Sequence, residues 1–370
     1  MFDDNISLSS YNYNMKKILI LKNELSPYNV PVYNEIAKCF DLTIGYYKED
    51  KSKQQCNFKK VSLSYHKIGP FIWIHNLGNV VNQYDLICIV PDLHVLSYCL
   101  LPFGKRNFKI VNWGIGFRVS YVHPYITNRK HNLLDKIYQG VVSRCDASIF
   151  YMEKAKEFWK ASSFDMDRVF VAPNTADVCP IEFVPHKKRN FLFVGTLYRG
   201  KGLDILLNSF QKARQISKQS VRLVIVGDGE MRDSITSFVE QHNLQGIVEL
   251  KGAIFDEKVL ADEFQNALLC ISPTQAGLSC PKSMGYGVPF VCRNDAITGG
   301  EMYHITSGVN GISYDHDQDL TNILIDAMNN PDKYVEMGRK AKMYYEQNAT
   351  IVHMAQGAID AFNYALDKRD

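Results

Sequence analysis

The sequence predicts an α/β protein built from two Rossmann-like domains that face each other across a cleft. Short apolar runs rich in β-branched residues alternate with helical stretches, which is typical of βαβ units and parallel sheets. The alternation starts twice, at Met15 and again at Asn190. The length of 370 residues also suits two domains. Because open α/β sheets bind ligands at the carboxyl ends of their strands, the cleft is the expected site.

The apolar runs and helical patterns place the elements in order along the chain. In the first half, strands are expected at 18–21, 42–46, 86–90, 109–112, 147–150 and 169–172, and helices at 30–39, 132–143 and 154–161. In the second half, strands are expected at 190–194, 222–226, 247–250, 268–272, 290–292 and 311–313. Helices there are expected at 202–216, 230–242, 257–266, 280–286, 317–329, 332–346 and 351–366.

The same patterns set the expected domain boundaries. The polar residues before the first strand predict a flexible extension, with either Met1 or Met15 as the start of the chain. A stretch with several prolines and a basic cluster separates the two alternating halves and predicts a linker. The expected parts are an extension (1–14), an N-terminal domain (15–178), a linker (179–189), a C-terminal domain (190–350) and a last helix (351–370) that packs back on the N-terminal domain.

Composition excludes several classes of protein. A charged fraction of 22% and a hydrophobic fraction of 46% are ordinary for a globular chain and argue against disorder. The net charge of +3 is too small to predict a nucleic-acid partner. Nine cysteines, an odd number with no pair at CxxC spacing, argue against a zinc site or a disulfide framework. With no apolar run of about 18–20 residues and no signal peptide, we expect a cytoplasmic protein.

The first motif lies after the strand 190–194. That strand ends at Gly195, and a short loop carrying Arg199 and Lys201 leads into a helix near Gly202. Glycines let backbone amides approach an anion, and the helix start and the two cations favour negative charge. The loop therefore predicts a diphosphate site. An ordinary strand–turn–helix with two solvated cations stays equally open.

Three further glycine-containing turns follow on the same expected sheet edge. They are Gly227-Asp228-Gly229, Gly252-Ala253-Ile254 and the stretch from Pro273 to Pro289, which contains Thr274, Gly277, Leu278, Ser279, Lys282 and Ser283. Hydroxyls and first-turn amides in the last stretch can bind phosphate or sugar hydroxyls. Lys282 in a helical first turn opposes the helix dipole, which hints at an anionic ligand. For each turn taken singly, a structural need for glycine is the competing interpretation.

These stretches, in this order, resemble the donor domain of GT-B glycosyltransferases of family 4, also called group 1. Pro173-Asn174 resembles the interdomain junction of that family, and the Gly299-Gly300 pair and the Gly308–Gly311 turn also match. The resemblance implies a GT-B architecture and a hexosyltransferase-type enzyme. In it, Gly195, Thr196, Arg199 and Lys201 bind the donor diphosphate, and the nucleotide sugar contacts Gly227, Gly252, Ala253, Ile254, Thr274, Gly277, Leu278, Ser279, Lys282 and Ser283.

The sequence departs from the family where two glutamates, separated by seven residues, are usual. Those positions hold Thr274 and Lys282. Glu301, just after the Gly299-Gly300 pair, is the nearest acidic residue in a matching loop and is the candidate for a catalytic sugar contact. A solvated glutamate at a helix start is an equally open interpretation.

In the first half, two loops resemble those of a family subgroup and predict acceptor contacts at Tyr28, Asn29, Trp113 and Gly114. His94 follows the strand 86–90 and is a second catalytic candidate. Cations beside aromatic residues, such as Lys105 and Arg106, are compatible with peripheral contact with the inner membrane surface, although solvated loops are the simpler interpretation.

The resemblance implies transfer of a sugar from a nucleotide-diphospho sugar to a glycan or lipid-linked acceptor in surface polysaccharide biosynthesis. It implies retention of configuration and no metal or other cofactor. Two alternatives stay open: a catalytically silent subunit that binds nucleotide sugars, and a GT-B nucleotide-sugar epimerase, which the missing glutamates disfavour.

Overall fold

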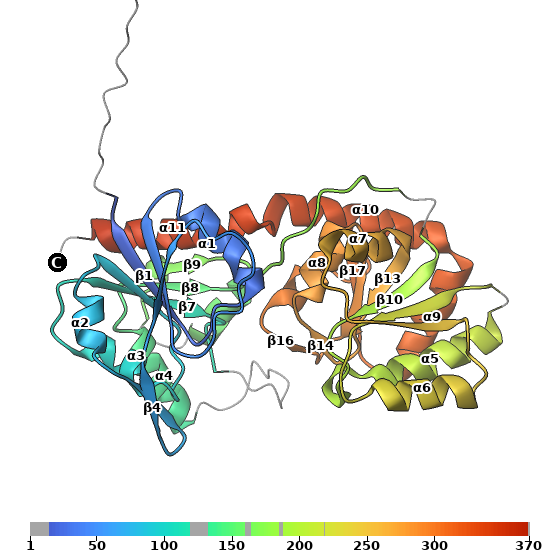
Figure 1. Ribbon diagram of the computed structural model, residues 1–370. Coiled ribbons are helices and arrows are strands. Elements are labelled where there is room, and N and C mark those ends of the chain that lie inside the picture. The colour runs from blue at the N-terminus through green and yellow to red at the C-terminus, as the bar shows by residue number, and fades with distance from the viewer. Residues whose placement is uncertain (1–14, 119–131, 160–163, 185–187, 218, 369–370) are drawn as a thin grey trace, which may run out of the picture.

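The structure is a computed structural model that describes residues 15–118, 132–159, 164–184, 188–217 and 219–368. The expected extension over 1–14 lies outside the described residues, as do His186 and Lys187 of the basic linker cluster. The described chain forms two α/β halves, each with its own parallel sheet, and two long C-terminal helices run along both (Figure 1). None of the described helices combines the length and the apolar character that crossing a membrane requires.

The N-terminal half contains a seven-stranded parallel sheet in the order β3-β2-β1-β6-β7-β8-β9. Its central strands are buried on both faces, which explains their continuous apolar sequences. The strands are β1 (Lys17–Lys22), β2 (Asp41–Tyr46), β3 (Lys59–Ser62), β6 (Leu86–Ile89), β7 (Lys109–Gly114), β8 (Ala147–Phe150) and β9 (Val169–Val171). The helices are α1 (Val30–Ile36), α2 (Leu77–Val81), α3 (Leu96–Leu100) and α4 (Leu133–Val142).

The C-terminal half contains a six-stranded parallel sheet in the order β12-β11-β10-β13-β15-β17. Its strands are β10 (Asn190–Val194), β11 (Arg222–Val226), β12 (Val248–Gly252), β13 (Ala267–Ile271), β15 (Phe290–Arg293) and β17 (Gly311–Tyr314). Its helices are α5 (Leu203–Ile216), α6 (Arg232–Gln241), α7 (Glu257–Asn266), α8 (Ser279–Gly285), α9 (Asp317–Asn329) and α10 (Pro331–Asn348). A short parallel pair, β14 (Gln275–Ala276) and β16 (Ile297–Thr298), lies beside this sheet.

Both sheets reverse their strand order at a central strand. The chain moves from β1 to β2 on one side and later returns to β6 on the other, and β10 relates to β11 and β13 in the same way. Ligands bind in α/β sheets beyond the carboxyl ends of strands at such reversals. The topology therefore indicates ligand positions at Lys22, which ends β1, and at Gly195, which follows β10.

The last helix, α11 (Ile351–Asp367), crosses to the N-terminal half and contacts α1, β7, β8 and β9 (Figure 1). Its buried face, including Met354 and Phe362, joins the apolar core that contains Ile18 and Ile20 of β1. Gly357 permits a close approach, because a Cβ at this position would lie 2.2 Å from the carbonyl oxygen of Val171.

The predicted strands and long helices match the structure within a few residues, and the α/β class is confirmed. Sequence reasoning missed β3, the short helices α2 and α3, and a hairpin of β4 (Tyr65–Ile68) and β5 (Phe71–Ile74). The strand β4 is exposed along its whole length, so it lacks the buried apolar run on which the prediction relied. The helix expected at 154–161 is instead a 3-10 helix over Glu153–Trp159.

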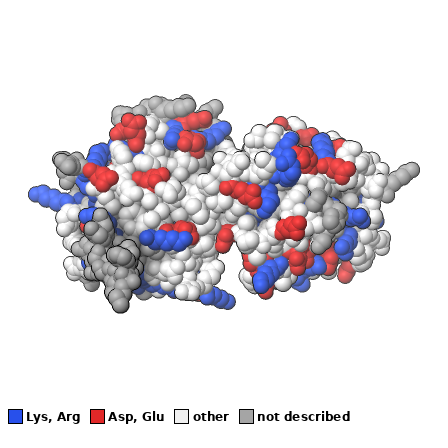
Figure 2. Space-filling view, turned by 90° about the horizontal axis from the view of Figure 1, so that it is seen from above, with Lys and Arg blue, Asp and Glu red and all other residues white. Residues whose placement is uncertain are grey.

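Charges of both signs are interspersed on the face shown in Figure 2. Several cations of the N-terminal half have carboxylate partners close by. The pairs are Lys51 with Glu24 at 2.9 Å, Lys59 with Asp41 at 2.7 Å, Lys60 with Asp50 at 2.8 Å and Arg106 with Asp146 at 2.9 Å. This pairing weakens the positive potential that peripheral membrane contact would need.

Candidate functional site

A cavity of about 620 Å³ lies between the two halves at the carboxyl ends of β1 and β10. Both halves and the segment that joins them contribute to its walls. The N-terminal half and the joining segment supply Lys22, Tyr28, Asn29, Ile115, Tyr151 and Asn174. The C-terminal half supplies Thr196, Tyr198, Lys201, Gln275, Ala276, Gly277, Leu278, Ile297, Thr298, Gly299 and Glu301. The cavity is therefore in the place that the strand reversals indicate.

Glu301 is the acidic residue of this cavity and is only 4% exposed. Its Oε1 accepts a hydrogen bond of 2.6 Å from the side-chain amide of Asn174. Its Oε2 accepts bonds from the Thr298 hydroxyl at 3.0 Å and from the Gly299 backbone N–H at 2.7 Å. Burial raises the pKa of Glu301, and these donors partly oppose the rise because they stabilise the ionised form. The carboxylate is thus held in place with both oxygens bonded.

Lys201 brings positive charge into the same cavity. It ends the 3-10 turn Arg199–Lys201, and its Cε would lie 3.6 Å from a Cβ placed on Gly195. Burial lowers the pKa of Lys201, and the charge of Glu301 acts in the opposite direction. Gly202, which follows, has a φ of 69° that favours glycine and lets the chain turn into α5. The loop therefore directs this lysine inward.

Arg199, the other cation of the loop, is exposed and lies outside the cavity walls. Its backbone N–H donates to a carboxylate oxygen of Glu230 at 3.3 Å. The four residues predicted to bind the diphosphate therefore differ in position. Thr196 and Lys201 line the cavity, Gly195 lies beside the lysine side chain, and Arg199 faces solvent.

The other glycine turns pack against each other. The Gly227 N–H donates to the Gly252 carbonyl at 2.8 Å, and a Cβ on Gly227 would lie 1.8 Å from the Gly195 carbonyl oxygen. The need for glycine here comes from backbone packing between turns. Gly227, Gly252, Ala253 and Ile254, predicted to contact the nucleotide sugar, do not line the cavity.

Only some of the predicted contacts around α8 line the cavity. Gly277 and Leu278 line the cavity, whereas Thr274 donates to the Gly200 carbonyl at 2.8 Å. The predicted contacts at Ser279, Lys282 and Ser283 lie outside the cavity walls. Lys282 pairs with Glu257 at 2.6 Å, and the buried Ser283 hydroxyl donates to the Val288 carbonyl at 2.7 Å. The local ion pair thus accounts for the lysine that the sequence linked to an anionic ligand.

Residues 180–344 match the family described as glycosyl transferases group 1. This C-terminal half is a group 1 glycosyltransferase domain, and the chain is a glycosyltransferase. An uncharacterized glycosyltransferase of Haemophilus influenzae is 22% identical over 269 residues, which are 71% of this chain and 72% of the relative. The N-acetylgalactosamine-N,N'-diacetylbacillosaminyl-diphospho-undecaprenol 4-alpha-N-acetylgalactosaminyltransferase of Campylobacter jejuni is 22% identical over 63% of this chain and 60% of the relative.

The solved structure of Anabaena HepE in complex with UDP has the same fold as the glycosyltransferase described here. The two superpose with a TM-score of 0.68 at 16% identity, over 94% of this chain and 99% of HepE. This likeness establishes the GT-B fold.

On the N-terminal wall of this glycosyltransferase, Tyr28 and Asn29, predicted to contact the acceptor, line the cavity. Trp113 and Gly114 belong to β7 and lie outside the cavity walls, with Trp113 only 5% exposed. His94 also lies outside the walls. Its exposed side chain contacts Asp92, with Nδ1 3.0 Å from Oδ1.

Sequence reasoning did not select Lys22, Tyr151, Tyr198, Gln275 or Thr298, which also line the cavity. It selected no role for Asn174, although this residue stands in the junction that resembles the family. The strand reversal at β1 is the signal that points to Lys22, because the reversal marks that strand end as a ligand position.

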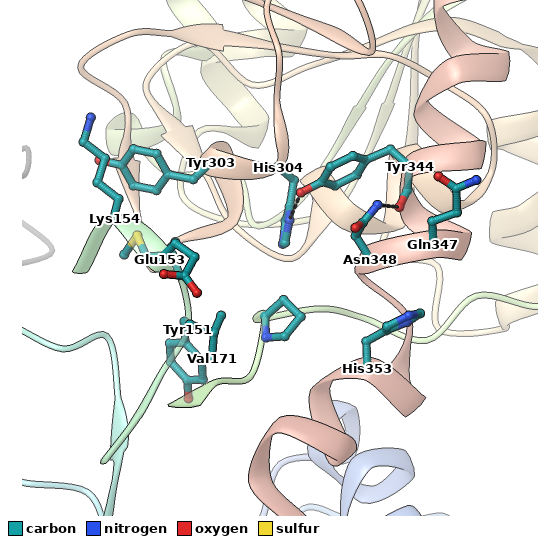
Figure 3. Close-up of a pocket in the computed structure, with 13 residues that line it drawn as sticks. Tyr151, Glu153, Lys154, Val171, Tyr303, His304, Tyr344, Gln347, Asn348 and His353 are labelled. Carbon is teal, nitrogen blue, oxygen red and sulfur yellow. Dashed lines mark hydrogen bonds between the residues drawn. The ribbon is translucent and has the colours of Figure 1, made fainter. Parts of the chain in front are cut away.

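A second cavity of about 560 Å³ lies where the chain passes between the halves (Figure 3). Its walls include Pro173, Tyr303, His304, Tyr344 and His353. His304 Nε2 lies 3.1 Å from the Asn174 carbonyl, and its Nδ1 lies 3.3 Å from the Tyr344 hydroxyl. Burial lowers the pKa of His304, which favours the neutral ring. Since a carbonyl can only accept, Nε2 carries the proton and Nδ1 accepts from tyrosine.

Proposed function

We propose that this glycosyltransferase transfers a sugar from a nucleotide-diphospho sugar to a glycan or lipid-linked acceptor in surface polysaccharide biosynthesis. The observation that carries the proposal is Lys201, a partly buried cation that faces the cavity between the halves. The Campylobacter jejuni relative is named for a diphospho-undecaprenol acceptor, and HepE was solved with UDP, which supports this donor and acceptor chemistry.

The reaction breaks the bond between the sugar C1 and the diphosphate oxygen and forms a bond from C1 to the acceptor oxygen. Negative charge develops on the leaving diphosphate, and Lys201, which lines the cavity, is positioned to stabilise it. The Thr196 side chain can donate a further hydrogen bond there. We propose that these groups replace a metal ion in balancing the charge.

Glu301 is the proposed carboxylate for the sugar. Both of its oxygens already accept hydrogen bonds from the protein, which fixes its orientation, and Oε1, which accepts only one of them, can accept another from a sugar hydroxyl. Its negative charge also favours the oxocarbenium character that develops at C1. We propose retention of configuration, with the proton of the acceptor hydroxyl passing to the leaving phosphate oxygen.

The test compares wild type with Lys201→Met for nucleotide binding and turnover. UDP, GDP, CMP and dTDP are titrated by calorimetry, and the sugar of the best-bound nucleotide is then tested for transfer or hydrolysis. We expect the variant to bind that nucleotide at least tenfold more weakly and to lose turnover. The matched control is Lys212→Met, which removes an exposed lysine of α5.

Unchanged nucleotide binding by Lys201→Met would overturn the diphosphate assignment. Binding without turnover of any donor would instead favour the silent partner subunit.

A further inference from the structure

Lys22 is a partly buried cation on the wall opposite Lys201. It is the last residue of β1, the central strand at which the N-terminal sheet reverses its order, and its side chain lines the cavity between the halves. Within the described part of the chain, its ammonium group has no ion pair or hydrogen bond. Burial lowers the pKa of Lys22. A charged group held in this way is costly unless a ligand supplies the opposite charge.

The described groups beside Lys22 in space and in sequence do not supply that charge. Burial raises the pKa of the Cys88 thiol beside Lys22 to about 12, so the thiol is neutral near pH 7. Glu24, two residues along the chain, pairs with Lys51 at 2.9 Å.

The charge on the cavity wall is also unbalanced as a whole. Among the residues that the structure describes, the charged ones that line it are Lys22, Lys201 and Glu301. Glu301 is the one acidic side chain among them, and it is bonded to Asn174, Thr298 and Gly299. Two lysines from opposite walls thus share a cavity with one carboxylate, so the N-terminal wall offers an anion a cation of its own, separate from the lysine proposed for the donor.

We propose that Lys22 binds an anionic group, a phosphate or a carboxylate, carried by the acceptor close to the hydroxyl that receives the sugar. The inference rests on the proposed function, which places the donor diphosphate against Lys201. Lys22 lines the wall with Tyr28, Asn29 and Ile115, on the N-terminal side where the acceptor enters. A lysine ammonium is a compact charge with three donors, so it suits either anion without a fixed bidentate geometry.

The experiment uses the full chain saturated with UDP and three glucose-derived probes, which carry a phosphate, a carboxylate and no charge. Glucose 6-phosphate, glucuronate and methyl glucoside are each titrated by calorimetry into wild type and Lys22→Met. In wild type we expect at least one anionic probe to bind tenfold or more tightly than methyl glucoside. In the variant we expect this difference to disappear. The stronger anionic probe distinguishes a phosphate from a carboxylate source.

Two further variants make the comparison specific. Lys17→Met removes an exposed lysine at the other end of the same strand and should behave as wild type. Lys22→Arg keeps the positive charge and should retain most of the preference for the anionic probe. If Lys22→Met does not fold, the comparison of wild type with Lys22→Arg and the preference of wild type for an anion still test the proposal.

Equal affinity of wild type for charged and neutral probes, or no binding of any probe, overturns the proposal. So does a loss of UDP affinity in Lys22→Met as large as that in Lys201→Met, which would assign Lys22 to the donor. Failure of the proposed function gives a different result, because wild type would then bind none of the four nucleotides, or would bind one without turning over any sugar donor.

Discussion

The side-chain amide of Asn174 donates a 2.6 Å hydrogen bond to Oε1 of Glu301, and the two residues are 127 positions apart in the sequence. Asn174 lies in the segment that leaves the N-terminal half, and its carbonyl oxygen also contacts His304. One residue therefore connects the buried carboxylate of the candidate site to His304 in the wall of the second cavity, which is shown in Figure 3. This connection makes the ionisation of Glu301 depend on how the halves are joined.

We expect Asn174→Ala to raise the pKa of Glu301 further, because the amide stabilises the ionised carboxylate. If the ionised form is needed for transfer, the acidic limb of the pH–rate profile should move to higher pH. A hydrogen bond to a charged group contributes about 1.5–3 kcal/mol, so a shift of about one to two pH units is expected. Asn208→Ala, on an exposed position of α5, is the control. An unmoved acidic limb would show that Glu301 does not control it.

The packing of the donor-side turns predicts that Gly227→Ala destabilises the C-terminal half. The new Cβ would lie 1.8 Å from the Gly195 carbonyl oxygen, and the φ of 146° is unfavourable for alanine. We expect a loss of about 2–4 kcal/mol in the free energy of unfolding, measured in urea. Gly78→Ala in α2 is the control, since nothing lies within 4 Å of its Cβ position. Equal midpoints for the two variants would contradict the packing argument.

The contact of α11 with the N-terminal half predicts a loss of stability in Gly357→Ala. In an exposed helix this change would add about 0.5–1 kcal/mol of stability. Here the Cβ would meet the Val171 carbonyl at 2.2 Å, so the sign should reverse. Gly140→Ala in α4 has only an ordinary contact at 3.8 Å, with Arg144, and should be neutral or stabilising. Thermal melting of both variants gives the test, and a higher melting temperature for Gly357→Ala would refute it.

Lys188 predicts a specific dependence of stability on pH. Burial lowers the pKa of this lysine to about 7, whereas in the unfolded chain it is near 10.4. Between these values the unfolded state binds more protons, so the contribution of Lys188 to stability increases as pH rises. From pH 7 to pH 9 this contribution should grow by about 2 kcal/mol. The contribution of the buried lysine is most unfavourable at pH 7 and below.

The variant Lys188→Met removes that contribution. The difference in unfolding free energy between Lys188→Met and wild type should therefore be largest near pH 7 and shrink toward pH 9. Lys212→Met is a matched control at an exposed position, and its difference from wild type should not change with pH. A constant difference for Lys188→Met would mean that its charge is not suppressed by folding.

The sequence predicted the strands of both sheets because buried parallel strands require apolar residues at successive positions, as in 223–226 and 267–271. It also predicted that Lys201 and Glu301 belong to a common region, through a resemblance that is carried by glycine turns. The exposed strands β4 and β5 carry no such requirement, and their sequences gave no usable pattern.

Which polar side chains enter the cavity was decided by tertiary structure. Lys282 and Lys201 both follow glycine-containing loops in the sequence, yet Lys282 meets Glu257 while Lys201 faces the cavity. Lys22 ends an ordinary apolar strand, and only the folded chain places it on the same cavity as Lys201. The sequence by itself determined the two α/β halves, because hydrophobic periodicity is local. The partners of each charge depend on contacts between distant segments, and these exist only in the folded chain.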